Sequence, residues 1–136
     1  MLFDGFALRD MWRSGANARQ ILKDALANGD ARWLQADSDV AYLDPDLEVY
    51  LKGLRGRARR ETEAHHDKVA DIMDDQDLSY DEVENFQSDY LAVATAEHTG
   101  DTLVTSRETR SGKKRLRIAA KCDADAACWK DIFDLN

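Results

Sequence analysis

Two aspartates, far apart in the chain, stand where carboxylates can take part in chemistry. Asp89 lies near the start of an Ala-rich segment, residues 88–96, that predicts a helix, and a glycine turn leads from it to an apolar strand at 101–106. Asp4 ends the short apolar run Leu2-Phe3. Parallel strands present their carboxyl ends at one edge of a sheet, where functional side chains gather. The pattern predicts that both acids meet at this edge and hold a divalent metal.

The chemistry that suits such a site is hydrolysis of a phosphodiester. One or two hard cations polarise the phosphate and lower the pKa of an attacking water. Mg²⁺ or Mn²⁺ binds carboxylate oxygens for this purpose and keeps several waters. Three or four acids from distant positions would supply the ligands, since without a metal or a bound proton they repel one another. Glu48, near a predicted helix start, and Glu108, in a polar segment, become candidates through the family resemblance given below.

Each of these acids also has a purely structural interpretation. Asp4 can serve as a turn residue or a helix cap at the end of its strand. Asp89 can lie on the solvent-facing surface of its helix or serve as a helix cap. Glu48 would interact favourably with the positive end of a helix. Glu108 stands among basic residues and suits a solvated salt bridge.

Basic residues are concentrated directly after the strand that is expected to border the site. A phosphate chain would pass there, and lysines and arginines supply most of the affinity for it. The side chains expected to contact an RNA backbone are Arg107, Arg110, Lys113, Lys114 and Arg115. A solvated loop, or a face for an acidic partner, is the alternative. The basic run 55–60 indicates a solvated helix face. His65-His66 indicates a structural or solvent-facing pair, because adjacent residues on a helix point too far apart to chelate one metal.

The strands that must position these residues follow from apolar spacing. The segments predicted as strands are 2–7, 32–35, 103–104 and 115–118. In the last of them Leu116 and Ile118 alternate with arginines, which is typical of a strand with one buried face. The segment before it, 107–114, is predicted as a polar loop.

Helices are predicted between these strands. One begins after Ser14 and ends at Asn28-Gly29, where glycine tolerates the left-handed conformation. From Asp46 the apolar spacing predicts two helices or one kinked helix reaching about residue 73. Ser79-x-x-Glu82 fits a capping box at the start of a further helix. Strands that alternate with helices favour an α/β fold with a mostly parallel sheet.

Size and composition indicate one globular domain spanning residues 1–136. The 136 residues are 43% hydrophobic and 34% charged, which is typical of a folded domain with a charged surface. The formal net charge of −8 argues against nucleic-acid binding by the whole surface but allows a local basic face. We expect a cytoplasmic protein without a membrane span or signal peptide. Cys122 and Cys128 match no common zinc spacing and are expected to be reduced thiols, with a disulfide as the alternative.

Motifs at both ends of the chain match one family. At the start they are Leu2-Phe3-Asp4-Gly5-Phe6-Ala7-Leu8, a strand that ends in an acid. Later they are the Ala-rich helix 89–96 and the strand Leu103-Val104-Thr105. Together these motifs resemble the PIN-domain superfamily, small α/β metal-dependent nucleases that include many toxins of toxin–antitoxin pairs. The tail, 115–122 and 132–135, is similar to an uncharacterised PIN-like subgroup.

The resemblance implies a three-layer fold whose central sheet has four to five short strands, and a Mg²⁺- or Mn²⁺-dependent endoribonuclease. Asp4, Asp89 and Glu48 would be catalytic metal ligands, with Asp44 as the alternative to Glu48, and Glu108 would be a fourth ligand. RNA would be the substrate, an antitoxin protein a partner, and a homodimer the assembly.

The chain departs from the family pattern at the site itself. Gly5-Phe6 replaces the polar residues that usually follow the first acid, and Ser106 stands where an acid often follows Val-Thr. These departures, with the acidic net charge, favour an alternative function: a catalytically degenerate PIN-like module for binding or regulation. An α/β interaction domain unrelated to this family is a third interpretation.

Overall fold

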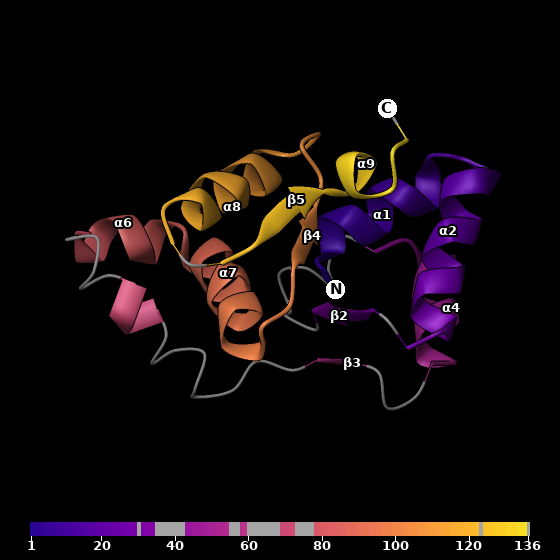
Figure 1. Cartoon of the computed structure of the whole chain (residues 1–136), viewed down its shortest axis with the longest axis horizontal. Coiled ribbons are helices and arrows are strands. Elements are labelled where there is room, and N and C mark those ends of the chain that lie inside the picture. The colour runs from indigo at the N-terminus through magenta and orange to yellow at the C-terminus, as the bar shows by residue number, and fades with distance from the viewer. Residues whose placement is uncertain are drawn as a thin grey trace.

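The computed structural model describes residues 1–29, 31–34, 43–54, 58–59, 69–72, 78–122 and 124–135. Its centre is a five-stranded sheet in the order β3-β2-β1-β4-β5, and every neighbouring pair is parallel (Figure 1). The strands are β1 (Leu2–Phe3), β2 (Arg32–Leu34), β3 (Ala58–Arg59), β4 (Leu103–Thr105) and β5 (Ala126–Cys128). The predicted α/β class with a sheet of four to five short strands is confirmed.

The central strand β1 sets the register of the sheet. Leu2 lies opposite Arg32 of β2 on one side and opposite Leu103 of β4 on the other. Because side chains alternate along a strand, Leu2 and Phe3 point into different hydrophobic cores. Because β1 and β4 are parallel, the residues that follow the two strands leave the sheet at the same edge. This brings Asp4 close to the end of β4.

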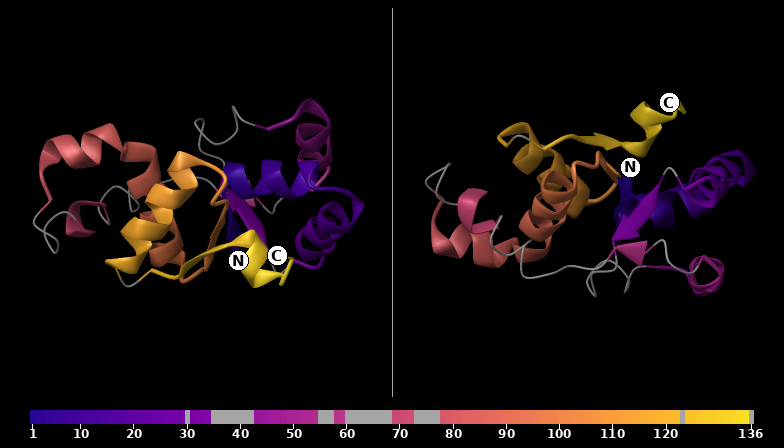
Figure 2. Two further views of the ribbon diagram at one scale, coloured as in Figure 1. Left: turned by 90° about the horizontal axis from the view of Figure 1, so that it is seen from above. Right: turned by 60° about the horizontal axis from the view of Figure 1, so that its bottom comes forward.

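One layer of helices covers the face of the sheet that carries Phe3 and Val104. Its helices are α1 (Gly5–Arg13), α2 (Ala16–Ala27), α4 (Pro45–Lys52) and the short α9 (Trp129–Ile132). Their apolar side chains, among them Leu22 and Leu47, form the core on that face. Figure 2 shows α1, α2 and α4 grouped to one side of the sheet.

The other layer consists of α6 (Tyr80–Asn85), α7 (Gln87–Thr99) and α8 (Arg110–Ala120). It packs on Leu2, Leu34 and Leu103, and the two views of Figure 2 place it across the sheet from α1 and α2. The small residues of α7, such as Ala92 and Ala96, let this helix lie close to the sheet. The sheet between two helical layers is the three-layer arrangement that was expected.

Local sequence signals account for the ends of several helices. The Ser79 hydroxyl accepts a hydrogen bond from the Glu82 backbone N–H at 3.2 Å, which confirms the predicted cap of α6. Gly100 ends α7 with a φ of 72°, a left-handed conformation that suits glycine. The second helix, α2, begins after Gly15 rather than at a Ser14 cap.

Three segments differ from the prediction. The strand expected at 2–7 ends at Phe3, because Asp4 caps α1 instead. The loop and strand expected at 107–118 are largely α8, whose buried residues Gly112, Arg115, Ile118 and Ala119 follow helical spacing. The helix expected from Asp46 ends at Lys52, and Ala58–Arg59 forms β3. The rest of the basic run, His65-His66 and most of the segment to residue 73 lie outside the described residues.

Two further observations bear on the class of protein. No helix among the described residues combines the length and the apolarity needed to cross a membrane. No disulfide joins Cys122 and Cys128 in the structure.

Candidate functional site

Asp4 is fixed at the edge of the sheet by contacts with α1 and β4. It is the N-cap of α1, and its Oδ1 accepts a hydrogen bond from the Ala7 backbone N–H at 2.8 Å. Its Oδ2 accepts a hydrogen bond from Thr105 Oγ1, at the end of β4, at 2.5 Å. The side chain is completely buried. Asp4 is therefore a helix cap, as its structural interpretation predicted. It also lies at the sheet edge where the metal site was expected.

Asp89 approaches Asp4 from the opposite layer. It lies in the first turn of α7 and is 4% exposed. The expected convergence of these two acids on one side of the sheet edge occurs. What lies between them, however, is a side chain of the protein itself.

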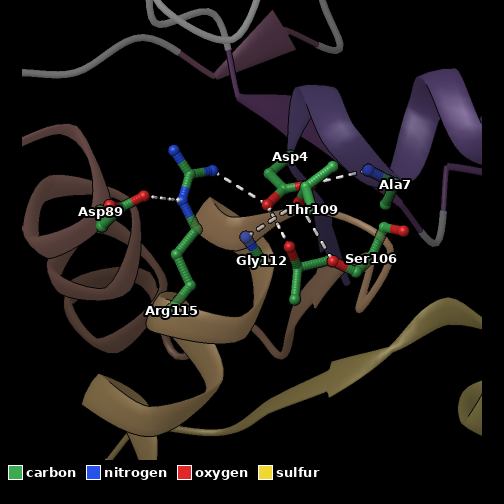
Figure 3. A network of polar contacts seen from close by, with 8 residues as sticks. Asp4, Ala7, Asp89, Ser106, Thr109, Gly112 and Arg115 are labelled. Atoms are coloured by element: carbon green, nitrogen blue, oxygen red, sulfur yellow. Dashed lines mark hydrogen bonds and ion pairs between the residues drawn. The ribbon is translucent and has the colours of Figure 1, made fainter.

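Arg115 connects the two acids. Its Nη1 donates to Asp4 Oδ2 at 2.9 Å, and its Nε donates to Asp89 Oδ1 at 2.9 Å (Figure 3). The guanidinium carbon lies 4.9 Å from the centre of the Phe6 ring, so an aromatic face borders the third side. Arg115 is fully buried. Its predicted role as an RNA contact is therefore wrong, because no part of its side chain reaches the surface.

The geometry does not fit a divalent cation. A guanidinium already occupies the space between the carboxylates and supplies the positive charge that a metal would bring. Mg²⁺ or Mn²⁺ would need both carboxylate oxygens and several waters around it, which requires Arg115 to leave. Removing a buried ion-pair partner costs about 3–5 kcal/mol. The residues present thus form a closed ion-pair triad, Asp4–Arg115–Asp89.

The other two predicted ligands do not join this triad. Glu108 has a side chain that is 64% exposed, and its carboxylate lies 3.3 Å from Lys130 Nζ. Glu48 lies in the first turn of α4, which belongs to the other layer. Across the part of the chain that the structure describes, no three acidic, histidine or cysteine side chains are placed to share a metal. The structural interpretations of Glu48 and Glu108 account for both positions.

Ser106 and Asp10 form a second polar network beside the triad. Ser106 Oγ donates to Asp10 Oδ2 at 2.8 Å and accepts from the Glu108 backbone N–H at 3.2 Å. Trp129 Nε1 donates to the same Asp10 oxygen at 2.7 Å. Ser106, which replaces the acid of the family pattern, therefore ties β4 to α1. Asp10 was missed from the sequence, where nothing distinguishes it from a solvent-facing helical acid.

A basic pocket opens where α7 and α8 begin. It has a volume of about 680 Å³. Its lining residues are Asn85, Phe86, Ser88, Asp89, Arg110, Ser111, Lys113, Lys114 and Arg117. Three predicted RNA contacts are among them, namely Arg110, Lys113 and Lys114. Arg107 is not, and its guanidinium lies 2.6 Å from the Asp131 carboxylate.

Lys114 forms one wall of this basic pocket. Its Nζ lies 2.5 Å from Glu82 Oε1 and 4.2 Å from the centre of the Phe86 ring. The hydrogen bond from Lys114 lowers the pKa of Glu82 below its usual range. Lys113 and Arg117 are exposed on α8, and Asp89 at the inner end of the pocket is compensated by Arg115. The pocket therefore presents an excess of positive charge on an acidic protein.

Compared with protein-family models and with curated protein sequences, the chain matches none.

Proposed function

We propose that this chain is a PIN-like domain that binds single-stranded RNA without cleaving it. The observation that carries the proposal is Arg115, a fully buried guanidinium that bridges Asp4 and Asp89 at the place where a metal was expected. A fixed cation satisfies both carboxylates, and it has no water or open coordination position to offer a phosphate. The alternative of a catalytically degenerate binding module fits this arrangement better than hydrolysis does.

The basic pocket supports a phosphodiester as the ligand. Arg110, Lys113 and Arg117 bring mobile or forked donors to one face of α8, and arginine pairs well with phosphate oxygens. The ion pair between Arg115 and Asp89 removes the repulsion that a lone carboxylate would exert on a phosphate. Phe86 adds an apolar wall beside the cations. A flexible single strand can place phosphates and a base in such a pocket, as single-strand binders do.

The test is fluorescence anisotropy with a labelled, unstructured RNA oligonucleotide in the presence of a chelator. The double variant Lys113→Gln/Arg117→Gln should weaken binding about tenfold or more, since each lost phosphate contact removes electrostatic affinity. It should also reduce the slope of log K against log salt by about 1.4, or about 0.7 per contact. The matched control, Arg32→Gln/Lys52→Gln, removes two exposed charges elsewhere and should bind as the unchanged protein does.

Two results would overturn the proposal of RNA binding. One is equal binding by the pocket variant and the control variant. The other is binding that appears only when a divalent cation is added, since Arg115 makes a metal unnecessary for the site as it stands. Folding of both variants is checked by circular dichroism, so that a lost structure is not mistaken for a lost contact.

A metal-dependent endoribonuclease, the toxin of a toxin–antitoxin pair, is the second candidate function. The convergence of Asp4 and Asp89 from distant parts of the chain favours it. Under this proposal the unchanged protein cleaves RNA in Mn²⁺, and Asp89→Asn abolishes cleavage while the exposed control Asp81→Asn does not. Millimolar Mn²⁺ would also raise the melting temperature, because a ligand of the folded state stabilises it by RT ln(1 + [L]/Kd). Neither effect is expected from the binding module.

A further inference from the structure

A second cationic pocket is lined by residues from the end of α1 and the start of α2. Figure 1 shows that these two helices lie at the opposite end of the molecule from α6. The pocket has a volume of about 370 Å³. The residues that line it are Trp12, Arg13, Gly15, Ala16, Arg19, Gln20 and Lys23. Three of these side chains are basic and none is acidic. We refer to it as the Trp12 pocket.

The cations of the Trp12 pocket differ in what holds them. Arg13 is paired with Asp44, its Nε lying 2.8 Å from Oδ2, and this pair lowers the pKa of Asp44. Arg19 and Lys23 instead lie over aromatic rings. The Arg19 guanidinium carbon is 4.2 Å from the centre of the Trp12 ring, and Lys23 Nζ is 5.4 Å from it. An aromatic face holds a cation in place without pairing with its charge. Asp44 and Asp46 also attract the Arg19 guanidinium, but through space and without a hydrogen bond to it.

The aromatic support is itself fixed. Trp12 Nε1 donates to Asp46 Oδ2 at 2.9 Å, and this hydrogen bond lowers the pKa of Asp46. The Tyr50 ring centre lies 5.7 Å from that of Trp12, and Lys23 Nζ is 5.2 Å from the Tyr50 ring. Trp12 is only 5% exposed, so the surrounding core holds its indole ring in one orientation. Cations carried on a fixed support lose little freedom when a ligand arrives.

Arg19 keeps hydrogen-bond donors for a ligand. Its Nε and one Nη donate to the Trp12 carbonyl oxygen at 3.0 and 2.7 Å. A guanidinium has five N–H donors in a planar fork, so further donors remain. Gly15 borders the pocket with a φ of 115°, and a Cβ added there would meet nothing within 4 Å. The pocket is therefore open on the side of Gly15.

We propose that the Trp12 pocket binds a phosphate monoester. A compact dianion matches a fork of donors beside an ammonium, because arginine pairs with two phosphate oxygens and lysine acts as a point charge. The volume accommodates a phosphate and a small attached group. The monoester is either a small phosphorylated molecule or the 5′-phosphate end of an RNA, and this site is separate from the basic pocket on α8.

Nuclear magnetic resonance gives a direct readout at this site. The indole N–H signal of Trp12, assigned with Trp12→Phe, is followed during a titration with inorganic phosphate against a sodium chloride titration of equal ionic strength. The proposal predicts a saturating shift of this signal with a millimolar or tighter Kd, while the signals of Trp33 and Trp129 stay in place. A shift that does not saturate, or one that chloride reproduces, would overturn it.

Variants locate the binding. Arg19→Gln/Lys23→Gln should weaken phosphate binding about tenfold or more, since each charge-assisted hydrogen bond contributes substantially. Gln20→Glu, an exposed change that leaves the aromatic support intact, should weaken it too by placing a negative charge at the rim. The control Arg32→Gln/Lys52→Gln should bind as the unchanged protein does. If Gln20→Glu and the double variant both bind phosphate normally, the assignment is wrong.

A final comparison distinguishes the two sources of the phosphate. An RNA oligonucleotide with a 5′-phosphate is compared with the same oligonucleotide carrying a 5′-hydroxyl, in the unchanged protein and in Arg19→Gln/Lys23→Gln. A preference for the 5′-phosphate that this variant loses identifies the RNA end as the ligand. Equal binding of both oligonucleotides, together with saturable phosphate binding, identifies a small phosphorylated molecule.

Discussion

The molecule holds its cations in contrasting ways on its two sides. Arg115 is enclosed by two carboxylates and is fully buried, so its charge is used within the fold. Arg19 and Lys23 lie over aromatic rings and are only partly buried, so a ligand can reach their charges. The group that contacts a basic side chain thus decides whether that side chain stabilises the fold or binds a ligand.

The largest expected effect follows from removing the enclosed cation. Arg115→Met leaves Asp4 and Asp89 buried without a counter-ion and should destabilise the protein by about 3–5 kcal/mol in urea unfolding. The neighbouring control, Arg117→Met, changes an exposed residue of the same helix and should stay within about 0.5 kcal/mol. If both variants unfold alike, Arg115 is not an architectural cation and the contrast with Arg19 fails.

The next effect concerns how closely α8 approaches the sheet. A Cβ at Gly112 would lie 1.8 Å from the Ser106 carbonyl oxygen, so Gly112→Ala must push α8 away from β4. We expect a loss of about 1–3 kcal/mol, as for other overpacked sites. Gly53→Ala, where the nearest atom is 3.3 Å away, is the control and should be close to neutral. A neutral Gly112→Ala would mean that the triad tolerates a shift of its helix.

Tyr90, next to Asp89, reports on how far water is excluded from the region around the Asp4–Arg115–Asp89 triad. Burial first, and then the charge of Glu82, raise the pKa of Tyr90 to about 12. The folded state thus holds this proton more tightly than the unfolded state does. The stability it contributes is complete below about pH 10 and is lost as the pH rises through about 12. Ultraviolet titration of tyrosinate should show one late-ionising group that Tyr90→Phe removes; titration near pH 10 would contradict this.

The smallest expected effect on stability belongs to the cation on an aromatic support. Arg19→Gln should destabilise the fold by about 1–2 kcal/mol, because it loses the cation–π contact with Trp12 and the hydrogen bonds to the Trp12 carbonyl oxygen. The same substitution should also weaken phosphate binding measurably, whereas Arg115→Met should change stability alone. Urea unfolding of this variant beside Arg115→Met sharpens the comparison, because a loss as large as that of Arg115→Met would make Arg19 architectural as well.

The sequence was sufficient for the fold class and for the approach of Asp4 and Asp89. Both depend on local signals, an acid after an apolar strand and an Ala-rich helix before another, and on the geometry of parallel strands. The role of Arg115 was not predictable in the same way. An arginine counts as polar in any apolar pattern, so Leu116 and Ile118 were taken as the buried face of a strand.

A signal for the correct element was nevertheless present. Thr109 caps α8 by accepting a hydrogen bond from the Gly112 N–H at 3.0 Å, and Gly112, Arg115 and Ile118 recur at every third position. To interpret this spacing as a helix, one must place Arg115 on the buried face. A buried arginine is favourable only because the carboxylates of Asp4 and Asp89, which are distant in the sequence, pair with it. Asp10 posed the same difficulty, since its partners Ser106 and Trp129 come from the other end of the chain.

The central position of β1 has a consequence for synthesis of the chain. Asp4, which follows β1, is separated by 101 positions from its partner Thr105 on β4. At a translation rate of 5–20 residues per second, this edge of β1 waits about 5 to 20 s for its neighbour to emerge from the ribosome. During that interval an apolar strand is open to chaperones or to another nascent chain, so slow translation of the middle segment would raise the risk of misassembly.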